Sequence, residues 1–180
     1  MKHSRELLRR QFVRMQYQNL QGFREHVENL VDVLGASRGD DNLIDLQPFF
    51  FRFTLDTTTA MIFGQSVGSL KHEGRDSFLD TFNEASLITA SRVRFGDLYW
   101  LYTPPGFSAA CKAVKTHTDQ FVKDALQQAQ NDQTGSTADR FAFITDLYSD
   151  HQDPRLVRDQ LVNVLLAGRD STASLMSYAL

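Results

Sequence analysis

Apolar side chains recur at spacings of three and four residues through most of the chain, and this is the period of an amphipathic α-helix. No stretch shows a convincing alternation of apolar and polar residues, which is the pattern of a half-buried β-strand. The pattern predicts helices over residues 1–18, 19–34, 43–63, 75–101, 107–130, 139–148 and 154–180. The sequence therefore predicts an all-α fold in which helices pack on helices.

The last of these helices should run through the core. Asp153 offers an N-cap acceptor and Pro154 takes the first helical position, so the helix is expected to begin there. From Pro154 to Leu180 it would be roughly 40 Å long, which is enough to cross a domain. Gly168 interrupts its apolar run, and a glycine inside a helix costs about 1 kcal/mol relative to alanine. We therefore expect another group to approach the helix backbone closely at Gly168.

The small residues around this glycine form a groove on the helix. One face carries Leu161, Leu165, Gly168 and Thr172, with Ala167 and Ser171 beside it. The hydroxyls of Ser171 and Thr172 can each bond to the carbonyl four residues earlier in the helix. The groove has two interpretations, a notch that packs against another helix and a surface that binds a ligand, and the spacing does not decide between them.

The composition is that of a folded protein without a nucleic-acid-binding surface. The 180 residues are 42% hydrophobic and include 14 phenylalanines, which is enough for the core of one domain or for part of a larger one. The 19 basic and 22 acidic residues are well mixed and give a net charge of -3, so no nucleic acid partner is expected. Cys111 is the only cysteine, which suits a reducing compartment and a small buried apolar side chain.

Common enzyme and targeting signals are absent from the sequence. It contains no Walker loop, dinucleotide fingerprint, HExxH, CxxC or GxSxG motif, and no signal peptide or membrane-spanning run. The first predicted helix starts without a cap, and the last stops within an apolar pattern. We therefore expect this sequence to be an internal part of a longer domain.

Two other segments are open to more than one interpretation. The first helix has a cationic face that is either solvated or binds a carboxylate or phosphate through Arg5 or Arg9. An aromatic group precedes a proline break and consists of Phe95, Tyr99, Trp100 and Tyr102. We expect this group to be part of the core, rather than a ligand entrance or a membrane contact, because aromatic side chains are more often buried than functional.

The segment Ala167-Gly168-Arg169-Asp170-Ser171-Thr172 resembles the central-helix motif of the cytochromes P-450, which are haem-thiolate monooxygenases. The family pattern is Ala/Gly-Gly-x-Asp/Glu-Thr-Thr/Ser. The opening Met1-Lys2-His3-Ser4-Arg5 resembles the family's Trp-x-x-x-Arg helix, with Met1 at the tryptophan position. Residues 51–56 and 63–64 resemble a later family helix, and residues 94–100 resemble the fungal branch that hydroxylates alkanes and fatty acids.

The resemblance covers essentially the whole sequence, in the same order and with the same separations. It implies that residues 1–180 are a partial cytochrome P-450 domain, from the third helix to part of the central helix. An N-terminal anchor and β-rich region and the C-terminal loop with the haem thiolate would lie outside it. Cys111 lacks the surroundings of that loop and is not expected to be the iron ligand, so the isolated chain is expected to be inactive.

The resemblance also implies a role for six residues. Arg5 would bind a haem propionate, and Ala167 and Gly168 would form the groove where the helix passes over the haem. Asp170 and Ser171 would be the acid and the alcohol of a proton relay, and Thr172 would support them. Ser171 replaces the commoner threonine and keeps the hydroxyl, but it lacks the methyl group that stiffens the side-chain rotamer.

The implied function is the insertion of one oxygen atom from O2 into an apolar C–H bond, with an n-alkane or a fatty acid as substrate. Electrons would come from an NADPH-cytochrome reductase, and the parent enzyme would lie on the cytoplasmic face of the endoplasmic reticulum membrane. The alternative is a non-catalytic helical module that binds a ligand or another protein and uses the notch only for packing.

Overall fold

The computed structural model describes residues 20–37, 43–71, 77–131 and 141–179. These residues form α2 (Leu20–Ala36), α3 (Gln47–Phe63), α4 (Ser77–Arg94), the 3-10 helix η1 (Gly96–Leu101), α5 (Phe107–Asn131), α6 (Ala142–His151) and α7 (Pro154–Ala179). The regular structure of the described ranges is all helical, so the all-α prediction is confirmed. The helix expected over residues 1–18 lies outside the described residues.

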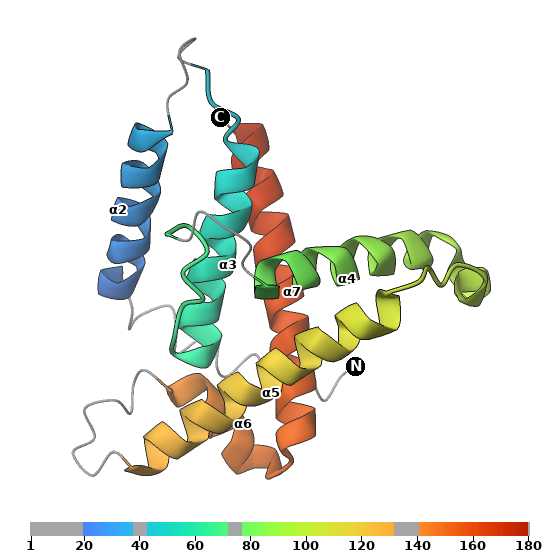
Figure 1. Cartoon of the computed structure of the whole chain (residues 1–180). Coiled ribbons are helices and arrows are strands. Elements are labelled where there is room, and N and C mark those ends of the chain that lie inside the picture. Colours follow the sequence, from blue (N-terminus) through green and yellow to red (C-terminus); the bar gives the residue numbers. More distant parts are fainter. Residues whose placement is uncertain (1–19, 38–42, 72–76, 132–140, 180) are drawn as a thin grey trace.

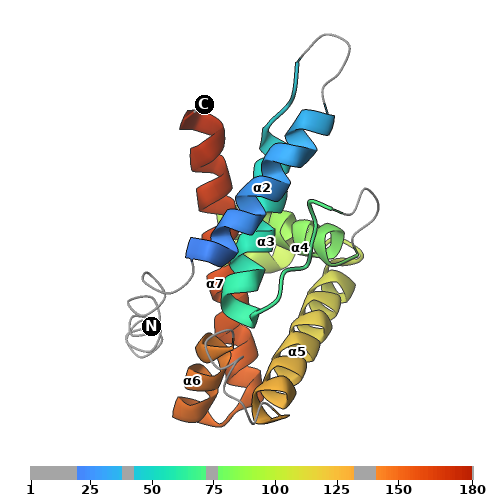
Figure 2. The same ribbon diagram turned by 90° about the vertical axis from the view of Figure 1, so that its left-hand side faces the viewer.

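α7 runs through the molecule, and the other helices are arranged along its length (Figure 1). α3 packs beside it in the most extensive helix contact of the described residues, and α2 lies on α3 (Figures 1 and 2). α4 and α5 run antiparallel to each other, α5 packs against α7, and α6 lies near the N-terminal end of α7 (Figure 1). None of the described helices is both long and apolar enough to cross a membrane.

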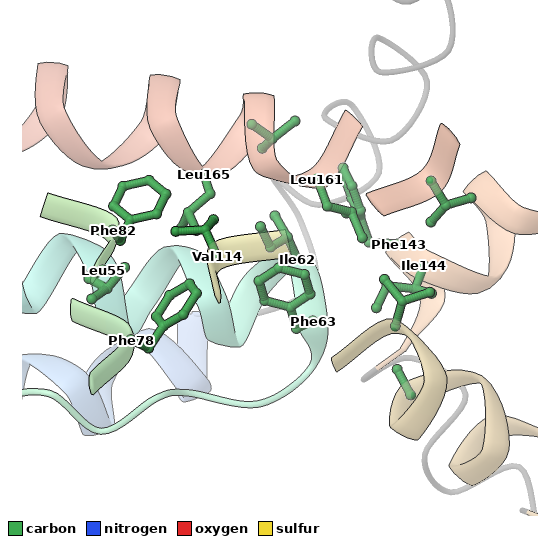
Figure 3. Packing of buried hydrophobic residues seen from close by; sticks show 14 of the residues in the cluster. Leu55, Ile62, Phe63, Phe78, Phe82, Val114, Phe143, Ile144, Leu161 and Leu165 are labelled. Atoms are coloured by element: carbon green, nitrogen blue, oxygen red, sulfur yellow. The ribbon is translucent and has the colours of Figure 1, made fainter. Parts of the chain in front are cut away.

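The larger core lies where α3, α4, α5, α6 and α7 meet. Figure 3 shows Leu55 of α3, Phe82 of α4 and Leu165 of α7 within it, and all three side chains are almost fully buried. A smaller cluster joins α2, α3 and α7, and it consists of Leu30, Phe50, Phe53, Leu70 and Ala173. Because α3 contributes to both clusters, it is buried on most of its surface.

The threonines of α3 fit this buried helix because they are satisfied within it. Thr54, Thr57 and Thr59 each donate a hydrogen bond to the carbonyl four residues earlier, at distances of 2.9, 2.8 and 2.8 Å. A buried hydroxyl without a partner is costly, so these bonds make the threonines compatible with the core.

Two predicted helix boundaries are confirmed. α3 ends at Gly64, which has the left-handed conformation of a helix C-cap (φ 70°). α7 begins at Pro154, and the Arg155 backbone N–H donates to the Asp153 carboxylate over 2.9 Å, as expected for an N-cap.

The predicted helix over residues 75–101 is wrong beyond Arg94. α4 ends there, Gly96 has a φ of 53°, and the chain continues as η1. Glycine adopts a positive φ without steric cost, so Gly96 can turn the chain where a continuous helix was expected.

The expectation that the aromatic group belongs to the core is also wrong. Tyr99 is 52% exposed and Trp100 is 61% exposed, and no residue of η1 is buried. The segment is held instead by Arg92, whose guanidinium lies 5.2 Å from the Tyr99 ring centroid and donates to the Tyr102 carbonyl over 2.9 Å. After the turn at Gly96, the chain runs outside the packed helices, so its aromatic rings face water.

Gly168 lies where α3 approaches α7. A Cβ atom at this position would be 3.4 Å from both Cγ2 and Oγ1 of Thr58, which is itself buried. The expected close approach at Gly168 is therefore present, and the approaching group is a side chain of α3.

The exposed position of Trp100, the single tryptophan of the chain, can be checked by fluorescence. We expect emission at the long wavelengths of a water-exposed indole and quenching by acrylamide almost as efficient as that of a free tryptophan derivative. Unfolding in urea should then change the emission wavelength little. Short-wavelength emission protected from acrylamide would show instead that Trp100 is buried.

The packing at Gly168 predicts how larger side chains are tolerated. Gly168→Ala should raise the free energy of unfolding by up to about 1 kcal/mol, because the methyl group meets Thr58 at van der Waals distance and alanine favours the helix. Gly168→Leu should lower it by about 2 kcal/mol or more, because the side chain has no space beside α3. Urea unfolding measures both changes.

Gly35 of α2 provides the control, since a Cβ there would meet nothing within 4 Å. Gly35→Leu should therefore be tolerated. Equal stability of the Gly168→Leu and Gly35→Leu variants would contradict the close packing of α3 on α7.

Candidate functional site

The six motif residues of α7 lie in three different surroundings. Successive residues of a helix point in directions about 100° apart, so a short segment contacts several neighbours. Ala167 and Ser171 are exposed, Arg169 is buried towards α4, and Gly168 faces α3. The segment is therefore both a packing surface and an open surface, and the two interpretations of the sequence are not exclusive.

The open surface is a continuous strip along α7, which we call the open face. Its exposed members follow helical spacing and are Asn163, Leu166, Ala167, Ser171, Leu175 and Tyr178. Leu175 is 69% exposed and Tyr178 is 90% exposed, although both are large hydrophobic residues. An apolar helix face of this kind is typical of a surface that binds a ligand or another part of a protein.

Ser171 places a hydroxyl on the open face next to Ala167. It donates to the Ala167 carbonyl over 2.5 Å, which confirms the expected bond to the carbonyl one turn earlier. The corresponding bond expected from Thr172 to the Gly168 carbonyl is not formed among the described contacts. The two hydroxyls therefore differ, since only that of Ser171 bonds within the helix.

Gly168 and Thr172 line an apolar cavity of about 470 Å³ between α2, α3 and α7. Its other lining residues are Phe23, Val27, Leu30, Phe53, Thr54, Thr57, Thr58, Met61 and Met176. Ala167 and Ser171 are not among the lining residues, so the predicted single groove is divided between the open face and the cavity.

No role was predicted for Arg169, which occupies the variable position of the motif. Its side chain is 3% exposed, and its Nη1 donates to the Asp170 carboxylate over 2.9 Å. Its Nη2 donates to the side-chain oxygen of Asn83 in α4. The sequence did carry a signal for the burial of Arg169, because this residue follows the buried Leu161 and Leu165 at the same four-residue spacing.

Burial lowers the pKa of the Arg169 guanidinium below the ordinary arginine value, and the charge and hydrogen bond of Asp170 offset this only in part. Arginine remains protonated in proteins, so the cation persists in this nearly dry position. Asp170 is its anionic partner, and the Asp170 side chain is 41% exposed. The predicted acid therefore has one oxygen held by a buried cation and access to solvent.

The open face is the part of the described structure that fits a haem. Ala167 has only a methyl group, so a flat macrocycle can approach the helix there, and Leu166 and Leu175 supply apolar contacts beside it. Ser171 supplies a hydroxyl on the same strip. Gly168 contributes less directly to this surface, because a side chain at this position would point towards Thr58 of α3.

Two other predicted residues do not meet this site in the described structure. Arg5, expected to bind a haem propionate, lies outside the described residues. Cys111 is half-buried and packs against the larger core, which agrees in part with the expected buried position. The described residues contain no group of three or more histidine, cysteine or acidic side chains that could hold a metal ion.

Comparisons with known proteins agree with the arrangement of the helices and the motif. A cytochrome P450 of Arthroderma benhamiae is 39% identical over 185 residues. Cytochrome P450 52A3-B of Candida maltosa and cytochrome P450 monooxygenase g430 of a Fusarium species are each 34% identical. The matches cover 98–99% of this chain but only 34–36% of those relatives, so the chain spans about a third of their length.

No solved structure gives a significant match to the chain. The family model described as cytochrome P450 matches residues 1–180, the whole sequence. Together with the all-α fold and the central-helix motif on α7, this match shows that the chain belongs to the cytochrome P450 family.

Proposed function

We propose that this chain is part of a haem-dependent monooxygenase that inserts one oxygen atom from O2 into an apolar C–H bond. The observation that carries the proposal is the strip on α7 where Ala167 and the Ser171 hydroxyl are exposed, next to the partly exposed Asp170. Family membership supports the same reaction class. The activity belongs to a whole protein of which this chain is about a third, by comparison with its relatives.

The open face would hold one side of the haem through Ala167 and the flanking leucines, with the backbone at Gly168 next to it. Arg5 would bind a propionate by a charge-assisted pair. When bound, the haem supplies the activation of O2, which protein side chains cannot perform themselves. The thiolate ligand of the iron would come from a cysteine other than Cys111, because Cys111 packs against the helical core.

Ser171 and Asp170 would supply protons during the reaction. The Ser171 Oγ atom lies on the open face, and its proton is donated to the Ala167 carbonyl in this structure. The Asp170 carboxylate reaches solvent and can exchange protons with water. Thr172 would play a supporting role from the cavity side of α7.

We further propose that the substrate is an n-alkane or a fatty acid and that an NADPH-cytochrome reductase supplies the electrons. The support for this substrate class is the resemblance of residues 94–100 to the fungal branch that hydroxylates such compounds. The same resemblance supports a location on the cytoplasmic face of the endoplasmic reticulum membrane.

The alternative is a non-catalytic helical module that binds an apolar ligand. The apolar cavity of about 470 Å³ between α2, α3 and α7 favours this alternative, since small-molecule sites are commonly of this size. The two functions differ in a simple respect, because only the oxygenase consumes O2 and releases a hydroxylated product.

Substitution of Ser171 tests the oxygenase. In the haem-containing protein that carries this sequence, Ser171→Ala should lower the hydroxylated product formed per O2 consumed by about tenfold or more, because a positioned proton donor is lost. Hydrogen peroxide should rise correspondingly, and Ser171→Thr should keep the coupling. Oxygen uptake, peroxide and hydroxylated dodecane or lauric acid are measured together.

Ser177 provides the matched control, because its hydroxyl donates to the Ala173 carbonyl over 2.9 Å in the same helix. Ser177→Ala removes the same kind of bond and should leave the coupling unchanged. If the unsubstituted protein binds an apolar ligand but consumes no O2, the alternative module is correct. Equal coupling in the Ser171→Ala and Ser177→Ala variants would remove Ser171 from the proposed relay.

A further inference from the structure

We propose that Arg169 is a positioning residue that fixes the Asp170 carboxylate beside the open face by tying it to Asn83 of α4. The inference rests on the proposed function, in which Asp170 takes part in proton supply. Asp170 is the one group of that proposal that Arg169 contacts in the described structure, so Arg169 would act only through Asp170.

The guanidinium is held on several sides. One nitrogen, Nη1, donates to Asp170 over 2.9 Å, and the other, Nη2, donates to the side-chain oxygen of Asn83. Its central carbon lies 5.1 Å from the ring centroid of Phe51 and 5.3 Å from that of Phe82. These contacts come from α3 and α4, so two neighbouring helices fix the position of a group that α7 carries.

Packing alone does not explain an arginine at this place. The side chain is 3% exposed, and its Nε is a buried nitrogen without a hydrogen-bond partner. Burial of a charged group is costly, and an apolar side chain of similar volume commonly stabilises a protein as well or better. The arginine therefore serves a purpose that an apolar residue between Phe51 and Phe82 would not serve.

α7 carries a second pair of neighbouring arginine and aspartate residues, Arg158 and Asp159, which can be compared with Arg169 and Asp170. Arg158 donates to Asp159 over 2.9 Å and also to Asp119 of α5 over 3.2 Å. Burial lowers the pKa of Arg158, but its two aspartates outweigh this effect and the net change is a rise. Arg169 has a neutral amide in place of the second aspartate, so Asp170 is the one carboxylate that it pairs with in the described structure.

The consequence for Asp170 is a carboxylate with one fixed oxygen. The Oδ1 atom is bonded to the buried guanidinium, while the side chain remains 41% exposed. Without this bond the carboxylate would rotate among its rotamers in solvent. Because proton transfer depends on the position of the donor and acceptor atoms, loss of the bond should uncouple O2 consumption from hydroxylation.

The experiment uses Asn83→Ala and Arg169→Lys in the haem-containing protein that carries this sequence. Asn83→Ala leaves Arg169 and Asp170 intact and removes only the anchor on α4, so it remains informative if Arg169 variants fold poorly. Arg158→Leu is the control, because it breaks the other Arg-Asp pair of the same helix. Each protein is assayed for hydroxylated product per O2 consumed.

A second measurement does not depend on activity. Carboxyl groups are labelled with a carbodiimide and glycine ethyl ester, and mass spectrometry gives the labelling rate of Asp170 relative to Asp159. Asn83→Ala and Arg169→Lys should raise this ratio, and lower the product formed per O2, by about fivefold, since a hydrogen bond to a charged group is lost. Arg158→Leu should not raise the Asp170 rate and should leave the coupling unchanged.

A purely structural role for Arg169 would raise the labelling of many carboxylates together and leave the coupling unchanged, and that result would overturn the inference. An unchanged labelling ratio in both variants would overturn it as well. If the unsubstituted protein forms no hydroxylated product, the proposed function fails instead, and the catalytic purpose of Arg169 fails with it.

Discussion

The packing of α3 against α7 is the most extensive helix contact of the described residues, and the positions of the motif residues follow from it. Gly168 meets Thr58 where the two helices approach, and α3 is buried because α7 covers one side of it and α2 another. This contact also sets the rotation of α7 about its axis. Once Gly168 faces α3, the helical period directs Arg169 towards α4 and leaves Ala167 and Ser171 exposed. The packing of one glycine thereby determines which motif residues are available for chemistry.

Local signals predicted most of the helical fold. The period of apolar residues located α7 and most of the other helices, and Gly64 and Asp153 marked helix ends through backbone requirements that act within a few residues. The aromatic segment was wrongly predicted to lie in the core. Aromatic side chains favour burial, but the sequence does not show whether another helix packs against them. Trp100 and its neighbours follow a turn at Gly96 that carries them outside the core.

The site was predictable only in part, for a related reason. The one-turn spacing of Ala167 and Ser171 predicted that they share a surface and that the hydroxyl bonds back to the helix, and both predictions are confirmed. The contact between Arg169 and Asn83 was not predicted, because charged residues usually lie in solvent and the two residues are 86 positions apart in the sequence. Contacts between distant helices are not encoded in any local spacing.

The hydrogen bond within the helix at Ser171 has a consequence for the direction of proton movement. While the hydroxyl hydrogen points to the Ala167 carbonyl, the oxygen presents only its lone pairs to the open face, so it accepts hydrogen bonds there and cannot donate one. Donation outward requires rotation about the Cβ–Oγ bond, and this rotation leaves the carbonyl of Ala167 without its extra partner. This one torsion angle therefore decides whether the Ser171 hydroxyl accepts or donates a hydrogen bond on the open face.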